Sequence, residues 1–143
     1  MTLFVLDASV AVKWFLPPKD ERLTAEALAL LKKYVQTEVR FIIPDLFWAE
    51  IASAFWKAIR LGRFDQTSAE EALRYLGNCD LPVYSTFTLL DRAFDIANAF
   101  DRSVYDSLYV ALAVHSRAPL ITADERLANS LAAHFPVKWL GAI

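Results

Sequence analysis

The amino-acid sequence predicts an α/β protein with a mainly parallel, roughly five-stranded sheet covered by helices on both faces. Short apolar runs with the composition of buried strands alternate with longer segments whose apolar residues recur at helical spacing. Strands separated by helices are joined by right-handed crossovers, which place the strands parallel in one sheet. The chain of 143 residues has no linker, repeat or low-complexity tract, so we expect one domain over residues 1–143.

The first half of the chain contains two predicted strands and two long helices. "LFVL" (residues 3–6) is a short apolar run typical of a buried strand, and "DASVAVKWFL" (residues 7–16) predicts a short helix. Residues 23–35 have the spacing of an amphipathic helix, and "VRFII" (residues 39–43) has the composition of a strand. Pro44 suits the first turn of a long helix over residues 44–62, and Gly62 suits its end.

The second half of the chain continues the alternation. Ser68 and Glu71 have the spacing of a capping box, which predicts a helix over residues 71–79. "LPVYS" (81–85), "PLIT" (119–122) and "VKWL" (137–140) have the composition of short strands. The remaining predicted helices cover residues 88–100, 103–118 and 123–135.

Composition excludes several classes of protein. Charges interrupt every apolar stretch well short of the ~18 residues that a membrane span requires. The single cysteine, Cys79, cannot form an intramolecular disulfide, and the first residues lack the pattern of a signal peptide, so we expect a cytoplasmic protein. The net charge of -2 gives no global attraction for nucleic acid, which would have to bind at local basic patches.

The aromatic content predicts an exposed apolar surface. Four Trp, five Tyr and ten Phe exceed what a small core usually absorbs. We therefore expect a homodimer and a groove for a helix of a partner protein. The residues expected on this surface are Trp14, Trp48, Phe55, Trp56 and Phe64.

Four acidic residues are expected at one edge of the sheet. Asp7 ends the first strand, and Asp124 lies two residues beyond the fourth. Glu50 lies in the second turn of the helix after the second strand, and Asp106 in the first turn of its helix. Ligands of open α/β sheets bind outside the carboxyl ends of the strands. Taken singly, Asp7 and Asp124 are equally explained as helix caps, and Asp106 by the helix dipole.

Glu50 is the acid that most needs a partner. It is the only ionisable residue between Leu46 and Trp56, and a buried glutamate without a partner is costly. An ion pair with Lys13, Arg102 or Arg126 is one possible explanation. A metal ion is the other, because four neighbouring carboxylates repel one another unless a cation neutralises them. Ligands that are all oxygen suit Mg²⁺ or Mn²⁺ rather than zinc.

Four segments carry a resemblance to a known family. "LDASVAVKWFL", "IPDLFWAEIASAF", "SVYDSLYVALA" and "PLITADERL" are similar to the motifs of PIN-domain nucleases, especially the VapC-type toxins of toxin–antitoxin pairs, over nearly the whole chain. The resemblance implies the PIN-like three-layer α/β/α fold. It also implies that Asp7, Glu50, Asp106 and Asp124 form the acidic quartet, with Asp7 and Asp106 as direct Mg²⁺ ligands. Ser9 and Thr122 match accompanying hydroxyl positions, although helix capping explains them as well.

The same resemblance implies a function. The expected activity is that of a metal-dependent endoribonuclease, which hydrolyses RNA phosphodiester bonds with Mg²⁺, or Mn²⁺ as its substitute, and acts as a toxin. Its expected partners are RNA, a second copy of the chain, and an antitoxin whose Arg or Lys reaches the quartet. Lys13, Lys57, Arg60, Arg63 and Arg102 are candidates for holding the phosphates that flank the cut.

Two other functions stay open from sequence alone. A non-catalytic module could use the quartet to bind a metal or a partner without hydrolysing anything. A phosphoacceptor receiver domain also gathers acids at the carboxyl edge of a parallel sheet. The chain resembles that class poorly, because no second acid accompanies Asp7 and no Lys follows "LIT".

Overall fold

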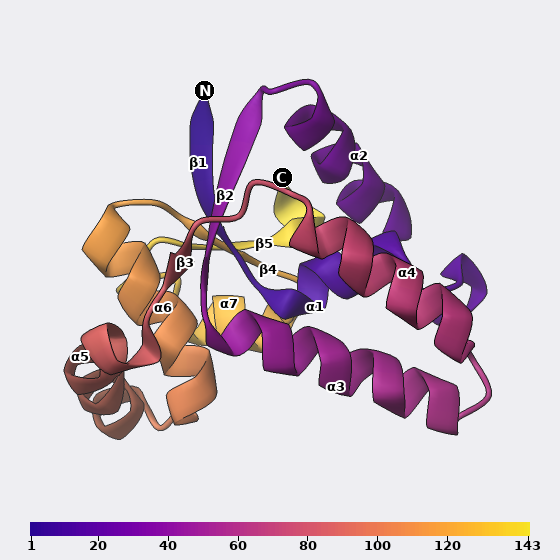
Figure 1. Cartoon of the computed structure of the whole chain (residues 1–143). Coiled ribbons are helices and arrows are strands. Elements are labelled where there is room, and N and C mark those ends of the chain that lie inside the picture. The colour runs from indigo at the N-terminus through magenta and orange to yellow at the C-terminus, as the bar shows by residue number, and fades with distance from the viewer.

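A five-stranded parallel sheet with strand order β3-β2-β1-β4-β5 forms the centre of the protein (Figure 1). The computed structural model describes all 143 residues. The strands are β1 (Thr2–Leu6), β2 (Val39–Pro44), β3 (Val83–Tyr84), β4 (Leu120–Thr122) and β5 (Val137–Trp139). In the central pair, Thr2 lies opposite Val39 and Val5 opposite Ile42. The predicted parallel α/β sheet is confirmed, and each strand lies within two residues of its expected bounds.

Seven α-helices and three short 3₁₀ segments connect the strands. The α-helices are α1 (Ala8–Ala11), α2 (Thr24–Val35), α3 (Leu46–Arg60), α4 (Gln66–Gly77), α5 (Thr86–Phe100), α6 (Val104–Ser116) and α7 (Glu125–Leu131). The 3₁₀ segments are Val12–Trp14, Pro18–Asp20 and Leu140–Ala142. No helix is both long enough and apolar enough to cross a membrane.

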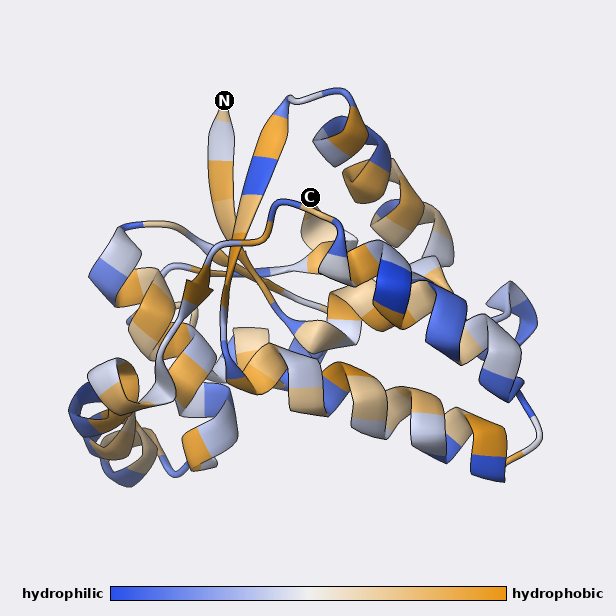
Figure 2. Cartoon of the chain, viewed as in Figure 1, coloured by the Kyte–Doolittle hydropathy of each residue, from blue (hydrophilic) through white to orange (hydrophobic).

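The sheet separates two hydrophobic cores. Side chains of a strand alternate between its faces, so Phe4 and Leu6 pack with α1–α4 while Val5 between them packs with α5–α7. Strand β2 repeats this division, because Phe41 belongs to the first core and Ile42 to the second. Figure 2 shows the sheet as predominantly hydrophobic. The result is the three-layer α/β/α arrangement.

Several predicted helix ends are wrong. Pro44 ends strand β2, and α3 starts two residues later at Leu46. Helix α4 begins at Gln66, because the carboxylate of Asp65 accepts hydrogen bonds from both the backbone N and the Oγ of Ser68 (2.8 Å each). The predicted capping box at Ser68 and Glu71 is therefore absent. Gly62 does terminate α3, with the positive φ of 69° that favours glycine.

Two other helices are shorter than expected. The segment predicted as a helix over residues 7–16 is an α-helix only over Ala8–Ala11 and then tightens into 3₁₀ geometry over Val12–Trp14. The segment predicted over residues 123–135 ends at Leu131.

The expected aromatic surface is largely inside the protein. Of the five aromatic residues assigned to it, Phe55 is buried, and Trp14, Trp48 and Phe64 are half-buried against the first core. Only Trp56 is exposed, at 62%. That expectation is wrong, because this core absorbs more aromatic area than we assumed. The other exposed aromatic side chains are Tyr75 on α4, Phe87 and Phe94 on α5, and Tyr105 on α6.

Candidate active site

The carboxyl ends of β1 and β4 form the natural ligand site of this topology. The chain leaves β1 toward β2 and β3 on one side, and then crosses to β4 and β5 on the other. The place where the strand order reverses is called the topological switch point. There the connections on the two sides of the sheet diverge and leave a crevice at the carboxyl ends of the strands. Asp7 directly follows β1, and its backbone N donates a hydrogen bond to the carbonyl O of Ile121 in β4 (3.1 Å).

The structure brings the four predicted acids to one cavity, which we call the acid cavity. Its volume is about 230 Å³, and its lining is Asp7, Ala8, Ser9, Val12, Glu50, Ala54, Asp106 and Asp124. No three acidic side chains stand close enough together to hold a metal ion as they are. Mg²⁺ does not require three, because it is usually held by one or two carboxylates and keeps several of its waters.

Asp7 is the most buried of the four acids, at 8% exposure. Its Oδ2 accepts hydrogen bonds from Thr122 Oγ1 (2.7 Å) and Ser9 Oγ (2.9 Å). Burial raises the pKa of Asp7 to about 6, against the lowering effect of these hydrogen bonds, and the charge of Glu50 raises it further. Asp7 therefore lies where a cation would stabilise its charged form.

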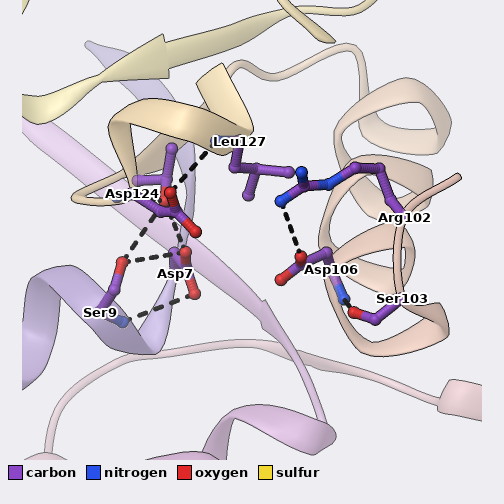
Figure 3. A network of polar contacts seen from close by, with 8 residues as sticks. Asp7, Ser9, Arg102, Ser103, Asp106, Asp124 and Leu127 are labelled. Carbon is purple, nitrogen blue, oxygen red and sulfur yellow. Dashed lines mark hydrogen bonds and ion pairs between the residues drawn. The ribbon is translucent and has the colours of Figure 1, made fainter. Parts of the chain in front are cut away.

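Ser9 and Thr122 link the ends of the two strands, and Figure 3 shows Ser9 beside Asp7. The Oγ1 of Thr122 accepts a hydrogen bond from the backbone N of Asp124, and the Oγ of Ser9 accepts one from the backbone N of Ala123, each at 3.0 Å. Thr122 is fully buried, whereas Ser9 is half-buried. Both hydroxyls thus position the backbone and the carboxylate of Asp7 rather than facing solvent.

Asp7 and Asp124 also act as helix caps. Asp7 is the N-cap of α1, and its Oδ1 lies 3.5 Å from the backbone N of Ser9. Asp124 is the N-cap of α7, and its Oδ1 lies 3.1 Å from the backbone N of Leu127. Asp124 is exposed. Each cap uses one carboxylate oxygen, which leaves the second oxygen of Asp124 without a protein partner. Capping and a place in the acid cavity are therefore compatible.

Glu50 has no ion pair, so the ion-pair explanation is wrong. Lys13 pairs with Glu21 (3.0 Å) and Arg102 pairs with Asp106 (3.2 Å), while Arg126 is exposed and unpaired. Burial raises the pKa of Glu50, and the charge of Asp106 raises it further. Glu50 is a half-buried acid whose charge nothing in the protein neutralises.

Asp106 lies at the start of α6, at the rim of the cavity. Ser103 caps this helix by accepting a hydrogen bond from the backbone N of Asp106 (3.0 Å), so the carboxylate of Asp106 is not used as a cap. Its Oδ2 instead faces Arg102, and the side chain of Asp106 is 35% exposed.

Tyr109 is a residue of the site that the sequence did not reveal. It follows Asp106 by one helical turn, is 2% exposed, and its hydroxyl makes no hydrogen bond of standard geometry. Its proximity nevertheless lowers the pKa of Glu50. Burial raises the pKa of Tyr109 itself, and the charges of Asp7 and Glu50 add to this effect, so it stays protonated. Its hydroxyl lies beneath the acid cavity.

Only one of the five candidate phosphate-binding cations contacts an acid of the cavity, and that one is Arg102. Lys57 and Arg63 line a hollow of about 260 Å³ that shares Val12 and Ala54 with the acid cavity. Arg60 lies over the ring of Trp56 at 5.5 Å. Lys13 lines a larger hollow of about 400 Å³, which also includes Asp124 and so adjoins the acid cavity.

Known proteins resemble this chain over most of its length. The family model for the PIN domain matches residues 4–130. Ribonuclease VapC3 of Pyrobaculum aerophilum is 30% identical over 131 residues, which cover 90% of this chain and 95% of that protein. Ribonuclease VapC9 of Mycobacterium tuberculosis is 32% identical over 99 residues, which cover 68% of this chain and 76% of that protein.

Solved structures share the fold at lower sequence identity. The crystal structure of PAE2754 from Pyrobaculum aerophilum superposes with a TM-score of 0.72 at 22% identity, covering 99% of this chain and 85% of that one. A toxin-antitoxin complex from Klebsiella pneumoniae contains a chain with a TM-score of 0.61 at 16% identity, covering 96% of each chain. The match of the PIN model to most of the sequence, together with the VapC relatives, shows that this chain belongs to the PIN domain family and, within it, to the VapC ribonucleases.

Proposed function

We propose that this protein is a metal-dependent endoribonuclease and the toxin of a toxin–antitoxin pair. The observation that carries the proposal is the acid cavity, in which four carboxylates from different parts of the chain meet at the switch point of the sheet. Relatives that are named ribonucleases, among them VapC3, support the reaction class.

The donor set fits a hard divalent ion. PIN nucleases in general depend on a divalent metal, and the polar side chains lining this cavity are carboxylates and one hydroxyl, with no histidine or cysteine. Such oxygen ligands suit Mg²⁺, with Mn²⁺ as a substitute. We assign Asp7 and Asp106 as direct ligands, and Glu50 and Asp124 as ligands through water. The metal, when bound, would supply a water that loses its proton near neutral pH and would relieve charge on the phosphoryl oxygens.

The protein's own groups have separate tasks in this reaction. Ser9 and Thr122 donate hydrogen bonds to one oxygen of Asp7 and so fix the direction of its carboxylate. Glu50 has a raised pKa, which suits its carboxylate to accept the proton of the attacking water. Tyr109 stays protonated near Glu50, and its hydroxyl is suited to donate a hydrogen bond to that carboxylate. Hydrolysis of an RNA phosphodiester needs both an oriented metal ligand and a proton acceptor.

The partners follow the same reasoning. A chain of a toxin-antitoxin complex from Klebsiella pneumoniae shares the fold, as does a chain of VapBC2 from Rickettsia felis, which supports an antitoxin as partner. A cationic side chain of that antitoxin, Arg or Lys, would enter the acid cavity and compete with the metal. We also propose a homodimer, for which the exposed aromatic residues of α5 offer apolar surface.

The test is RNA cleavage by the purified protein in Mg²⁺ or Mn²⁺ and in EDTA. We expect cleavage with metal and none with chelator, and loss of cleavage in Asp7→Asn. The matched control is Asp95→Asn, which removes an exposed acid of α5 outside the cavity. Cleavage that continues in EDTA would overturn the proposal. Metal binding without cleavage of any RNA would favour the non-catalytic binding module. Membership of the PIN family leaves no support for the receiver-like alternative.

A further inference from the structure

We infer that Arg102 occupies two positions in the reaction cycle: it pairs with Asp106 while the metal is absent, and it turns to a phosphate of the RNA once the metal has bound. This inference rests on the proposed ribonuclease function and names a residue that holds its substrate. It concerns a side chain at the junction of α5 and α6, at the edge of the acid cavity.

A short turn between α5 and α6 positions the backbone of Arg102. Asp101, in the left-handed conformation with a φ of 54°, ends α5, and Ser103 caps α6. The backbone N of Arg102 donates a hydrogen bond to the carbonyl O of Ala97 (3.3 Å). The turn therefore fixes the backbone of Arg102 next to Asp106, and any change of partner falls to its side chain.

The ion pair uses only part of the guanidinium. Figure 3 shows the side chain of Arg102 pointing toward Asp106. Nη2 of Arg102 lies 3.2 Å from Oδ2 of Asp106, while Nε is buried and has no hydrogen-bond partner. A buried donor without a partner costs about 1–3 kcal/mol. A phosphate group offers several acceptor oxygens, and the planar guanidinium can bind two of them at once through parallel N–H groups. The unused donors of Arg102 match such a ligand.

The position of the charge argues against a purely structural role. Arg102 directly precedes the N-cap of α6, where the helix dipole disfavours a positive charge, and directly follows the C-cap of α5, where the dipole favours one. These two effects oppose each other. The side chains of Arg102 and Asp106 are partly exposed, at 22% and 35%, and exposed pairs contribute little to stability. Helix dipoles and the ion pair therefore give an arginine at this position little net stabilising effect.

Electrostatics gives the reason for the change of position. Arg102 is the only cation that contacts an acid of the cavity, and its charge offsets that of Asp106. A metal ion at Asp106 takes the same carboxylate and repels the guanidinium. The RNA phosphate that enters with its negative charge is then the nearest partner for the displaced Arg102.

The experiment measures metal binding and RNA cleavage separately in Arg102→Met and Arg102→Lys. Calorimetric titration of the RNA-free protein with Mn²⁺ should show roughly twofold to fivefold tighter binding in Arg102→Met, because a partly exposed competing ion pair is lost. At saturating Mn²⁺ the same variant should lose about 10- to 100-fold in kcat/KM on RNA, the range for a hydrogen bond to a charged group. Arg102→Lys should keep wild-type metal affinity and recover part of the cleavage. Arg92→Met, on the exposed side of α5, is the control and should match the wild type.

The two readouts must move in opposite directions for the inference to hold. Metal affinity that is unchanged or weaker in Arg102→Met would overturn it, and so would wild-type kcat/KM in that variant. If Arg102→Met does not fold, Arg102→Lys with cleavage equal to the wild type would overturn it instead. Each of these results leaves the ribonuclease proposal intact, because the wild type still cleaves RNA. A wild-type protein that binds no Mn²⁺ and cuts no RNA would overturn both.

Discussion

On one side of the acid cavity Asp7 accepts hydrogen bonds from two hydroxyls, whereas on the other side Glu50 has no partner and Asp106 has only the ion pair with Arg102. We call the first the strand side, made of Asp7, Ser9, Thr122 and Asp124, and the second the helix side, made of Glu50, Asp106 and Tyr109. On the strand side, Asp7, Ser9 and Thr122 are hydrogen-bonded to one another before any ligand arrives, and only one oxygen of Asp124 has no protein partner. The helix side has unneutralised charge and an unused hydroxyl.

The difference follows from how the two sides are attached to the fold. Strands β1 and β4 are adjacent, and Leu6 lies opposite Ile121. The residues that follow the two strands therefore lie close together. Glu50 and Asp106 come from α3 and α6, which belong to opposite layers of the protein. Groups that depend on the packing of separate helices are held less rigidly. In the proposed function, metal and substrate would complete the helix side, while the strand side is preorganised.

Removing either direct ligand tests whether both sides serve the same metal. Asp7→Asn and Asp106→Asn should each lower RNA cleavage by about 100-fold or more, because the ion loses a charged ligand while the shape of the side chain is kept. Cleavage assays at several Mn²⁺ concentrations measure this, with Asp95→Asn as control. Full activity in Asp106→Asn would break the account, since the helix side would then be dispensable.

The pH dependence of the free energy of unfolding tests Asp7, the buried acid of the strand side. In the folded protein the pKa of Asp7 is raised from 3.8 to about 6, so the folded state binds the proton more tightly than the unfolded state does. Burying the charged form of Asp7 lowers the free energy of unfolding. This cost is absent below pH 3.8, grows as the pH rises, and is complete above about pH 6. It amounts to at most about 3 kcal/mol.

Denaturant unfolding in EDTA across this pH range measures the effect. The free energy of unfolding of the wild type should fall relative to that of Asp7→Asn as pH rises, and then stay level. The two proteins share every other titrating group, so their difference isolates Asp7. A difference that does not change with pH would show that Asp7 is not strained in the metal-free protein.

Thr122→Val tests the hydrogen-bonded side directly. The substitution keeps the shape of the side chain but removes the donor to Asp7 and the acceptor for the backbone N of Asp124. Because Thr122 is fully buried, the free energy of unfolding should fall by about 1–3 kcal/mol. Thr88→Val, at an exposed position of α5, is the matched control and should cost little. An equally small loss in both variants would contradict preorganisation of the strand side.

Tyr109→Phe is the counterpart on the helix side. The hydroxyl of Tyr109 is buried without a standard hydrogen bond, so its removal should change the free energy of unfolding by less than about 0.5 kcal/mol, or raise it. The kcat for RNA should fall, and its pH profile should shift upward, because the pKa of Glu50 loses the lowering effect of Tyr109. Stability loss comparable to that of Thr122→Val would erase the distinction between the two sides.

The sequence was sufficient to predict the sheet and the meeting of the four acids. Alternating apolar runs define the strands, and a parallel sheet brings their carboxyl ends to one edge, so Asp7 and Asp124 could be placed without coordinates. The start of α4 was not predictable in this way, since Asp65 and Ser68 are both good caps and tertiary context selects between them.

The sequence also could not predict which side chains lie next to the four acids. Arg102 was one of three cations considered for Glu50, and only the turn between α5 and α6 directs it to Asp106 instead. Tyr109 lies in an apolar run of α6 that is buried on all sides from Ser107 to Ala113, so its pattern is that of a core residue. Its place beneath Glu50 depends on how α6 packs, which spacing does not encode.

We propose that the acid cavity holds a metal ion between its two sides. The most direct test is the anomalous scattering of Mn²⁺ in crystals of the wild-type protein. We expect a peak in the acid cavity at coordination distance from carboxylate oxygens of both Asp7 and Asp106, with the guanidinium of Arg102 no longer on Asp106. A cavity without a peak at millimolar Mn²⁺, or a peak only at acids outside the cavity, would contradict it.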